Sequence, residues 1–516
     1  MNIETVNEKV KACKFVGHEN IIEVVEGDVI VPDIKPDILS LINVDGNVFV
    51  TKKEVHSGKV KLDGAVEVFA LYVADDERAS IKGLNALLNF NESIDIPDAN
   101  EGMLAIVNYK LIGIEHKVLN SRKISVKCSI EIDIKVIGEE EIEVTKDLLE
   151  PGNIQYKKEN ICLSELVGAA CQKVEVKENI MLSDGKPPIS EILKTKLSII
   201  NCGYKISYNK ILVKADLRVN AVYVADNETM SVETLDSLVP IAGFIDLNGV
   251  SDKDLISIDT TLNSAYVKPI YQDLKANGIN IEVQIDICAK AYGEKRLEVL
   301  SDLYNPVYEL NIENKKVVLN QNVDAKYEEI DLSQVLPIPE LANATLLDLS
   351  VIPNINEMKK NGTRTTVEGN ANLEILYYDR EKKKIDIKKI ELPYQKTFDS
   401  TCEDVNVVVT NLEYILRDNG QLDLKILLKI ICEDVNHINL NLITKIEQTD
   451  VKNVPVASLV IYYVQPGDNL WNIAKKFKTT VELIKSSNNL KDDMIFPGQQ
   501  LIMPKVVDKV VVNPLI

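Results

Sequence analysis

The sequence lacks the features by which membrane and secreted proteins are usually recognised. No stretch approaches about 18 consecutive apolar residues, so no membrane-spanning segment is expected. The first twenty residues hold neither an apolar run nor a small-residue cleavage site, which predicts a chain that is not secreted. Acidic residues outnumber basic residues, and the resulting net charge of −20 argues against nucleic acid or an anionic membrane as a partner.

Aromatic residues are also scarce, at 5% of the chain with a single tryptophan, Trp471. Cores must therefore be built from Ile, Leu and Val, which favours β-structure. The eight cysteines are scattered and form no Cys-x-x-Cys pair, and several, such as Cys128, Cys288 and Cys432, lie in strand-like runs. This pattern is typical of reduced thiols in a cytosolic protein.

Motifs of catalysis are missing as well. There is no Walker loop, no Gly-x-Gly-x-x-Gly, no Gly-x-Ser-x-Gly and no His-Glu-x-x-His. The four histidines lie far apart without partners at ligand spacing: His18, His56, His116 and His437. Acidic clusters such as residues 139–141 are typical of solvated turns. We therefore expect a protein that is not an enzyme and holds neither a metal nor a cofactor.

What the chain does contain is an internal repeat with a period of about 150 residues. Three similar strand endings mark it: LYVAD at 71–75, VYVAD at 222–226 and LYYD at 376–379. Their marker tyrosines are Tyr72, Tyr223 and Tyr377. Each ending closes a run of alternating apolar and polar residues, which predicts a strand with one face in a core.

The flanks of the markers repeat too. A Pro-containing or acidic stretch before each marker predicts a short helix, at 33–39, 186–193 and 331–337. After each marker come an apolar stretch and then a hairpin-like pair of segments. The pairs are 104–114 with 123–137, 255–265 with 280–291, and 405–416 with 421–431. We predict three antiparallel β-domains, sandwich- or barrel-like, each with one short helix.

Breaks in the pattern set the expected domain boundaries. Glu150-Pro151-Gly152 ends the first repeat, because Pro and Gly interrupt strands and helices. A polar stretch at 313–316 separates the second repeat from the third. The expected units are repeat 1 (1–150), repeat 2 (151–312), repeat 3 (313–450), a linker (451–458), a small α+β module (459–505) and a tail (506–516).

The module near the C-terminus predicts a β-α-α-β arrangement. An apolar run at 460–464 leads through a Pro-Gly turn to Asp468, a predicted N-cap of the first helix. Thr480 is the predicted cap of a second helix, and residues 499–503 form a closing strand. The fold class is therefore mainly β, with three repeated domains followed by a small βααβ module.

The residues of this module resemble the LysM module, a small carbohydrate-binding domain of bacterial wall proteins. The resemblance is carried by Tyr462, Val464, Gly467, Asp468, Leu470, Ile473, Ala474, Asn488, Pro497, Gly498, Gln499, Leu501 and Pro504. In that family, the loop after the first strand and the loop before the last strand form the groove for N-acetylated glycans. This chain departs by having Asn469 where the family usually has Thr or Ser.

The resemblance implies one candidate face for a glycan or a protein partner. Trp471 either half-covers the small core or is an exposed anchor, since tryptophan is enriched at binding hot spots. The lysines after it are either a solvated face or a contact for an acidic partner. The face comprises Gly467, Asp468, Asn469, Leu470, Trp471, Lys475, Lys476, Lys478, Asn488, Ile495, Phe496, Pro497, Gly498 and Gln499.

The strand endings and Pro-containing starts of the repeats resemble the SPOCS domain, a sporulation-associated module of endospore-forming bacteria. The third repeat departs from the others at LYYD. Together with a LysM module, the repeats resemble the SPOCS–LysM spore coat morphogenetic proteins of clostridial spore-formers. That resemblance implies a scaffold that starts in the mother-cell cytoplasm and tethers coat layers to the forespore surface.

The same resemblance implies that the LysM module docks the coat ATPase SpoIVA, with other coat proteins as further partners. The alternative is a wall or cortex protein that binds peptidoglycan, an N-acetylglucosamine polymer, through the LysM groove. That alternative requires export, which the first residues do not support. A wall hydrolase is not favoured, because no catalytic pattern accompanies the module.

Overall fold

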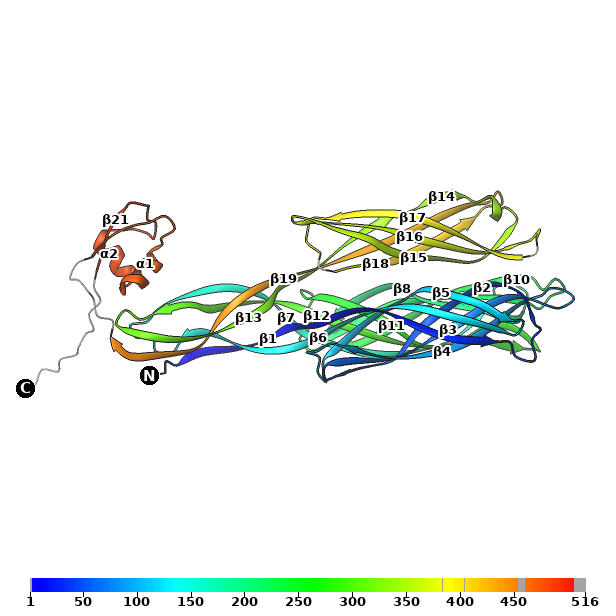
Figure 1. The fold of residues 1–516 in the computed structure, drawn as a ribbon, viewed down its shortest axis with the longest axis horizontal. Coiled ribbons are helices and arrows are strands. Elements are labelled where there is room, and N and C mark those ends of the chain that lie inside the picture. The colour runs from blue at the N-terminus through cyan, green and yellow to red at the C-terminus, as the bar shows by residue number, and fades with distance from the viewer. Residues whose placement is uncertain (1, 383, 403, 453–459, 505–516) are drawn as a thin grey trace, which may run out of the picture.

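The structure, a computed structural model, describes residues 2–382, 384–402, 404–452 and 460–504. It is elongated (Figure 1), with three β-sandwich lobes at one end. Long strands continue from the lobes into a narrow stalk, and the small α+β module lies at the far end of that stalk. The prediction of a mainly β chain with a small βααβ module is confirmed.

Each repeat builds one lobe from two packed sheets. In repeat 1, one sheet has the order β2 (Ile38–His56), β3 (Lys59–Ala74), β4 (Ile81–Asp95). The other has the order β1 (Thr5–Ile30), β6 (Lys123–Leu148), β5 (Leu104–Asn120). Every second residue of β6 from Ile124 to Val136 is buried, so its alternating sequence supplies one wall of the core.

Repeats 2 and 3 follow the same plan. In repeat 2, one sheet has the order β8 (Ile189–Ser207), β9 (Lys210–Ala225), β10 (Val232–Asp246). The sheet that packs against it has the order β7 (Gln155–Met181), β12 (Lys275–Tyr304), β11 (Leu255–Gln272). In repeat 3, one sheet has the order β15 (Ala344–Asn361), β16 (Arg364–Asp379), β17 (Lys384–Phe398). The sheet that packs against it contains β13 (Tyr308–Asp331), β19 (Gln421–Lys452) and β18 (Asp404–Leu416). A short strand, β14 (Gln334–Pro337), also pairs with β19.

The three predicted hairpins are confirmed as β5–β6, β11–β12 and β18–β19. The predicted short helices are wrong. In repeats 1 and 2 the Pro-containing stretches are turns that lead directly into β2 and β8. In repeat 3 the predicted stretch holds the end of β13 and the strand β14, and a 3-10 turn, Pro339–Leu341, follows it. A proline forces the residue before it toward extended backbone, which suits entry into a strand better than a helix.

The connections between repeats are short turns. The first spans Leu149–Ile154, and the second spans Asn305–Val307. The polar stretch 313–316, where the sequence suggests a break, lies inside β13 and pairs with β19. All four of its residues are exposed, so their polar side chains meet solvent on both faces of β13 and do not interrupt the strand. The predicted linker falls largely outside the described residues, as does the predicted tail.

The marker tyrosines occupy matching places on β3, β9 and β16. The hydroxyl of Tyr72 donates to the carbonyl of Pro36 at 2.9 Å, and that of Tyr223 donates to the carbonyl of Pro187 at 3.2 Å. Both rings are completely buried. In two repeats, therefore, the marker strand holds the turn that starts the lobe, which explains why the two sequence features recur together.

The lobes meet at one shared cluster. The residues that precede the marker tyrosines (Leu71, Val222 and Leu376) are all buried in it. Their cross-strand partners are Asn43, Lys194 and Asp348. The Lys194 ammonium pairs with the carboxylate of Asp348 at 2.8 Å and with that of Asp45 in repeat 1. Charge thus joins the matching positions of repeats 2 and 3, and Asp45, two residues after the matching Asn43, brings repeat 1 into the same ion-pair cluster.

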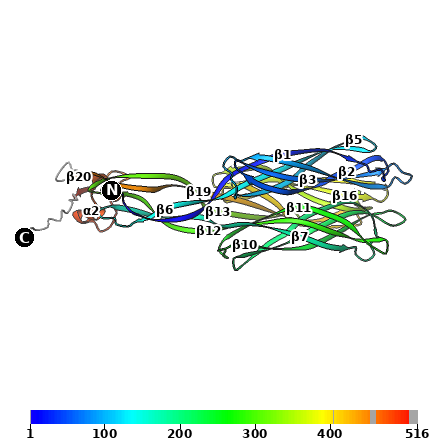
Figure 2. The same ribbon diagram turned by 90° about the horizontal axis from the view of Figure 1, so that it is seen from below.

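The stalk is made by the pairs β1–β6, β7–β12 and β13–β19 (Figure 2). Each pair contributes apolar side chains to two buried clusters along the stalk, among them Val10, Leu163 and Leu442. The strands are long because each forms part of a lobe at one end and part of the stalk at the other.

The prediction of reduced cysteines is wrong for four of them. Disulfides join Cys171 to Cys288 and Cys402 to Cys432. The first pair is 117 residues apart in sequence, yet β7 and β12 place the two residues directly opposite each other. Cysteine spacing could not reveal this, because only strand register brings them together. Cys128, Cys162 and Cys202 are free thiols.

Among the described residues, no helix has the length and apolar character needed to cross a membrane.

Candidate functional site

The small module has the predicted order of elements: β20 (Val460–Tyr463), α1 (Leu470–Phe477), α2 (Val481–Asn488) and β21 (Gln500–Met503). The two strands pair antiparallel. The apolar side chains spaced along the helices, with Leu501 of β21, form its buried core. Leu470 is 2% exposed, so this candidate site residue belongs to the core rather than to a contact surface.

The cap of α1 differs from the prediction. Asn469 caps the helix, because its side-chain oxygen accepts the backbone N–H of Asn472 at 2.8 Å. Asp468 instead accepts the N–H of Gln465 at 2.8 Å and the hydroxyl of Tyr462 at 2.7 Å. These bonds lower the pKa of Asp468. The asparagine that departs from the LysM pattern therefore does the capping, while Asp468 braces the first loop.

The predicted cap of α2 is confirmed, since Thr480 accepts the N–H of Leu483 at 3.1 Å. Asn488, at the end of α2, uses its side chain within the module. Its amide donates to the carbonyls of Ile484 and Ile502, both at 2.8 Å, and accepts the N–H of Ile502 at 2.7 Å. This candidate site residue thus ties α2 to β21.

Two loops lie side by side at one end of the module. Val464 accepts the N–H of Gly498 at 2.8 Å and donates to the carbonyl of Gln499 at 3.0 Å. Gly467 and Gly498 have φ of +90° and +85°, which only glycine adopts readily. We call the exposed residues of these loops the loop face: Gly467, Asn469, Met494, Phe496, Pro497 and Gly498.

The loop face carries two large exposed apolar side chains, Phe496 at 63% and Met494 at 65% exposure. Ile495 and Gln499 lie half-buried behind them, and Gln499 braces the loop by accepting the N–H of Phe496 at 3.0 Å. The arrangement presents apolar surface beside backbone and asparagine groups. Such a surface can bind a sugar ring or a protein side chain.

One side of α1 contacts the stalk. Trp471 donates from its indole N–H to Asp302 of β12 at 2.8 Å, and its ring meets that of Tyr304 edge-to-face at 5.1 Å. Lys475 pairs with the same Asp302 at 2.5 Å. The Tyr304 hydroxyl donates to the carbonyl of Thr479 at 2.8 Å. Trp471 is half-buried, and what covers it is the stalk of its own chain.

The three candidate lysines are therefore separated by the structure. Lys475 is engaged with the stalk, and Lys476 lies over the ring of Tyr462 at 4.9 Å. Lys478 is exposed in the left-handed conformation that ends α1. Asp302 and Tyr304 were not among the residues predicted from sequence, and no motif marks them in the run 301–306.

Within the described ranges, no group of three or more His, Cys, Asp or Glu side chains could hold a metal ion.

Comparison with known families matches these elements. A LysM domain model matches residues 462–504, and a model described as SipL, SPOCS domain, matches residues 37–119 and 188–270. The chain carries SipL-type SPOCS domains and a C-terminal LysM domain. Both SPOCS matches begin at the turn bound by the marker tyrosine and end in β5 or β11. Repeat 3 lies outside the matched ranges but has the same strand order.

The SPOCS match suggests a role in spore coat morphogenesis and coat-protein interactions, and the LysM match suggests peptidoglycan binding. Several individual relatives are similar to short parts of the chain. A probable autolysin, SsaALP, of Staphylococcus aureus is 53% identical over 36 residues, which is 7% of this chain and 14% of the relative. A probable endopeptidase, p60, of Listeria monocytogenes is 50% identical over 46 residues, 9% of this chain and 10% of the relative.

The uncharacterised protein YkzQ of Bacillus subtilis is 46% identical over 39 residues, 8% of this chain and 52% of the relative. The matches to hydrolases cover the LysM region alone, so the chain spans only a small part of those relatives. No solved structure matches the chain significantly.

Proposed function

We propose that the protein is a non-enzymatic scaffold of the bacterial spore coat, and that its LysM module docks the coat ATPase SpoIVA at the forespore surface. The observation that carries this proposal is the way in which the module packs against the stalk. Asp302 and Tyr304 hold the Trp471 side of α1 against the stalk. The loop face remains exposed, and the module that carries it lies beyond the stalk from the lobes.

The chemistry of the loop face supports a protein contact. Phe496 and Met494 are large apolar side chains on one short loop, and both are mostly exposed. Burying an exposed phenylalanine or methionine side chain contributes about 1.5–3 kcal/mol, so two neighbouring ones can anchor a partner. The docking residues of this proposal are therefore on the loop face, and Trp471 and Lys475 act by holding the module.

The lobes suit a scaffold that keeps its shape. They are joined through buried apolar side chains and through the Lys194 ion pairs rather than by flexible tethers. In this proposal, other coat proteins contact the lobes while the stalk sets their distance from the docked module. The protein then works on the mother-cell side of the forespore surface.

A second candidate function is favoured by the same open loops. A LysM groove requires both loops to be accessible, and Gly467, Asn469 and Pro497 are exposed. Binding of an N-acetylglucosamine polymer at this face would make the protein a cortex or wall binder. Both candidate functions use the loop face, so the glycan and the protein partner would compete for the same residues.

A capture experiment with purified full-length chain and SpoIVA separates them. The double variant Met494→Ala and Phe496→Ala is expected to reduce capture of SpoIVA at least tenfold. Leu483→Ala, on the exposed side of α2, serves as the matched control and is expected to leave capture unchanged. Undiminished capture by the double variant contradicts docking through the loop face. Retention of the wild-type chain on purified peptidoglycan, lost in the double variant, would favour the second function.

A further inference from the structure

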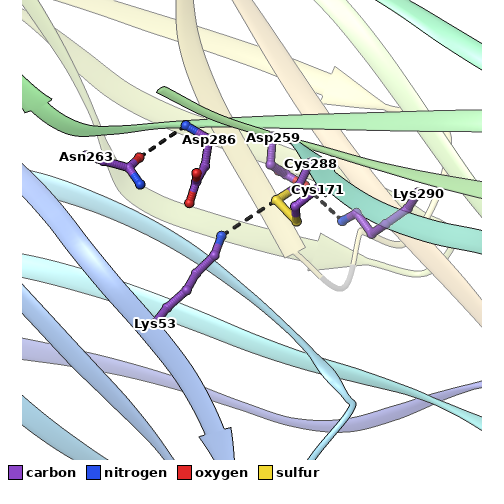
Figure 3. Close-up of a disulfide and its surroundings, with 7 residues drawn as sticks. All are labelled: Lys53, Cys171, Asp259, Asn263, Asp286, Cys288 and Lys290. Carbon is purple, nitrogen blue, oxygen red and sulfur yellow. Dashed lines mark hydrogen bonds and ion pairs between the residues drawn. A yellow bond between two sulfur atoms is a disulfide. The ribbon is translucent and has the colours of Figure 1, made fainter. Parts of the chain in front are cut away.

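The disulfide between Cys171 and Cys288 lies at the contact between two lobes rather than inside one. It joins β7 to β12 in repeat 2, on the face of that sheet turned toward repeat 1 (Figure 3). Ile287 and Ala289, the neighbours of Cys288 in β12, point into the core of repeat 2 instead. Alternation along β12 thus sends Cys288 outward to meet the neighbouring lobe.

The two sulfur-bearing residues have very different access to solvent. Cys288 is 3% exposed, because β11 and repeat 1 cover it. Cys171 is exposed. In the described part of the chain β1 pairs with β7 at Glu165, and no strand is paired with β7 on its outer side at Cys171. A solvent thiol can therefore approach Cys171 but not Cys288.

A lysine from repeat 1 stands beside the buried sulfur. Lys53 of β2 reaches across the contact, and its ammonium nitrogen lies 3.6 Å from Sγ of Cys288 (Figure 3). Burial lowers the pKa of Lys53, while the carboxylates of Asp286 and Asp259 favour its charged form. A neighbouring ammonium stabilises a thiolate and lowers its pKa, which makes it a better leaving group.

We propose that Cys171–Cys288 is a thiol-exchange site that takes a cysteinyl thiol at Cys171. The incoming thiolate attacks Sγ of Cys171 and forms a new S–S bond there. The bond between Cys171 and Cys288 breaks, and its electron pair leaves on Sγ of Cys288. One disulfide is consumed and one is formed, so the step needs no separate oxidant or reductant. Lys53 holds the departing thiolate within repeat 2.

The second disulfide of the chain is a natural control. Cys402 and Cys432 are both completely buried, and Sγ of Cys432 lies 3.7 Å from the hydroxyl oxygen of Ser400. Neither sulfur is open to attack, and the neighbour is a neutral hydroxyl rather than an ammonium. This pair should stay intact under conditions in which the first pair exchanges.

The test uses the oxidised full-length chain, with its accessible free thiols first blocked by N-ethylmaleimide. Glutathione is added, the reaction is quenched with acid, and peptide mapping locates the adduct. The expected result is glutathione on Cys171, a free thiol on Cys288 and an intact Cys402–Cys432 pair. An adduct on Cys288, equal labelling of both residues, or exchange at Cys402–Cys432 at the same rate would overturn the proposal.

The role of Lys53 is tested by the exchange rate of Lys53→Met. Loss of the cation that stabilises the departing thiolate is expected to slow exchange on the order of tenfold. Lys52→Met is the matched control, because the neighbouring Lys52 is exposed and pairs with Glu54 instead. An unchanged rate in Lys53→Met refutes the leaving-group role. If Lys53→Met does not fold, peptide mapping of the wild-type chain still shows whether the sulfur of Cys171 is the one attacked.

Discussion

Lys194 of repeat 2 and Asp348 of repeat 3 form an ion pair of 2.8 Å in which the side chains are 4% and 8% exposed. They occupy matching positions of their repeats, each opposite the residue before the marker tyrosine. Burial alone disfavours the ammonium of Lys194, but the carboxylates of Asp348 and Asp45 outweigh it and raise its pKa. Three repeats of one chain are thereby joined by a single buried charge.

Lys194→Met should destabilise the lobes strongly. It leaves the Asp348 carboxylate buried without its main partner, and breaking a buried pair in this way costs about 3–5 kcal/mol. Urea unfolding followed by circular dichroism measures the loss. Lys210→Met, in an exposed pair with Asp246, is the matched control and should change little. Equal effects of the two substitutions would show that the buried charge does not join the lobes.

Asp45 predicts a loss of stability in acid. Burial favours its neutral form, but Lys194 and Lys196 outweigh this and lower its pKa from 3.8 to about 2. Because the folded pKa is depressed, the stabilisation is present above pH 4 and is lost as pH falls toward 2. The difference corresponds to about 2 kcal/mol. In urea unfolding between pH 7 and pH 2, Asp45→Asn should lower stability at pH 7 and lessen the loss in acid; an identical acid profile contradicts the assignment.

The seat of the LysM module can be followed by fluorescence, because Trp471 is the sole tryptophan of the chain. Asp302→Ala removes the partner of both Trp471 and Lys475. The expected result is a red-shifted emission and increased quenching by acrylamide as the indole meets water. Glu298→Ala, an exposed residue of the same strand, should leave both unchanged. Unaltered emission in Asp302→Ala would mean that the stalk does not hold the module.

The marker tyrosines make a smaller, local prediction. Burial raises the pKa of Tyr72 to about 12, so its hydroxyl stays protonated and donates to Pro36. Tyr72→Phe leaves that carbonyl without this donor and should cost about 1 kcal/mol in urea unfolding. Tyr208→Phe, at a residue 97% exposed, should cost nothing measurable. If the two variants are equally stable, the repeated tyrosine contributes through packing alone.

Local pattern was sufficient to predict strands and hairpins, because alternation and turn residues act over a few positions. The predicted pairs 104–114 with 123–137 and 405–416 with 421–431, which form the hairpins β5–β6 and β18–β19, are examples. The same local evidence gave a wrong prediction at residues 33–39. The sequence there looks like the start of a helix, but in the structure it is a turn that leads into a paired strand. It also could not show that the polar stretch 313–316 continues a strand, since the stalk that receives it is formed by distant segments.

The candidate site was only partly accessible from sequence for the same reason. The LysM pattern identified both loops, but Trp471 had two interpretations that only its neighbour could separate. That neighbour is Asp302, 169 residues away, and no motif surrounds it. The Cys171–Cys288 disulfide is similar, because strand register rather than spacing brings the two residues together.

The central claim is that the loop face brings this scaffold to the forespore. The most direct test is the position of a fluorescent fusion of the full-length chain in sporulating cells that lack their own copy. The account predicts that the wild-type chain forms a ring around the forespore. The variant Met494→Ala with Phe496→Ala should stay diffuse in the mother cell at equal abundance, while Leu483→Ala still forms the ring. A complete ring formed by the double variant would contradict the account.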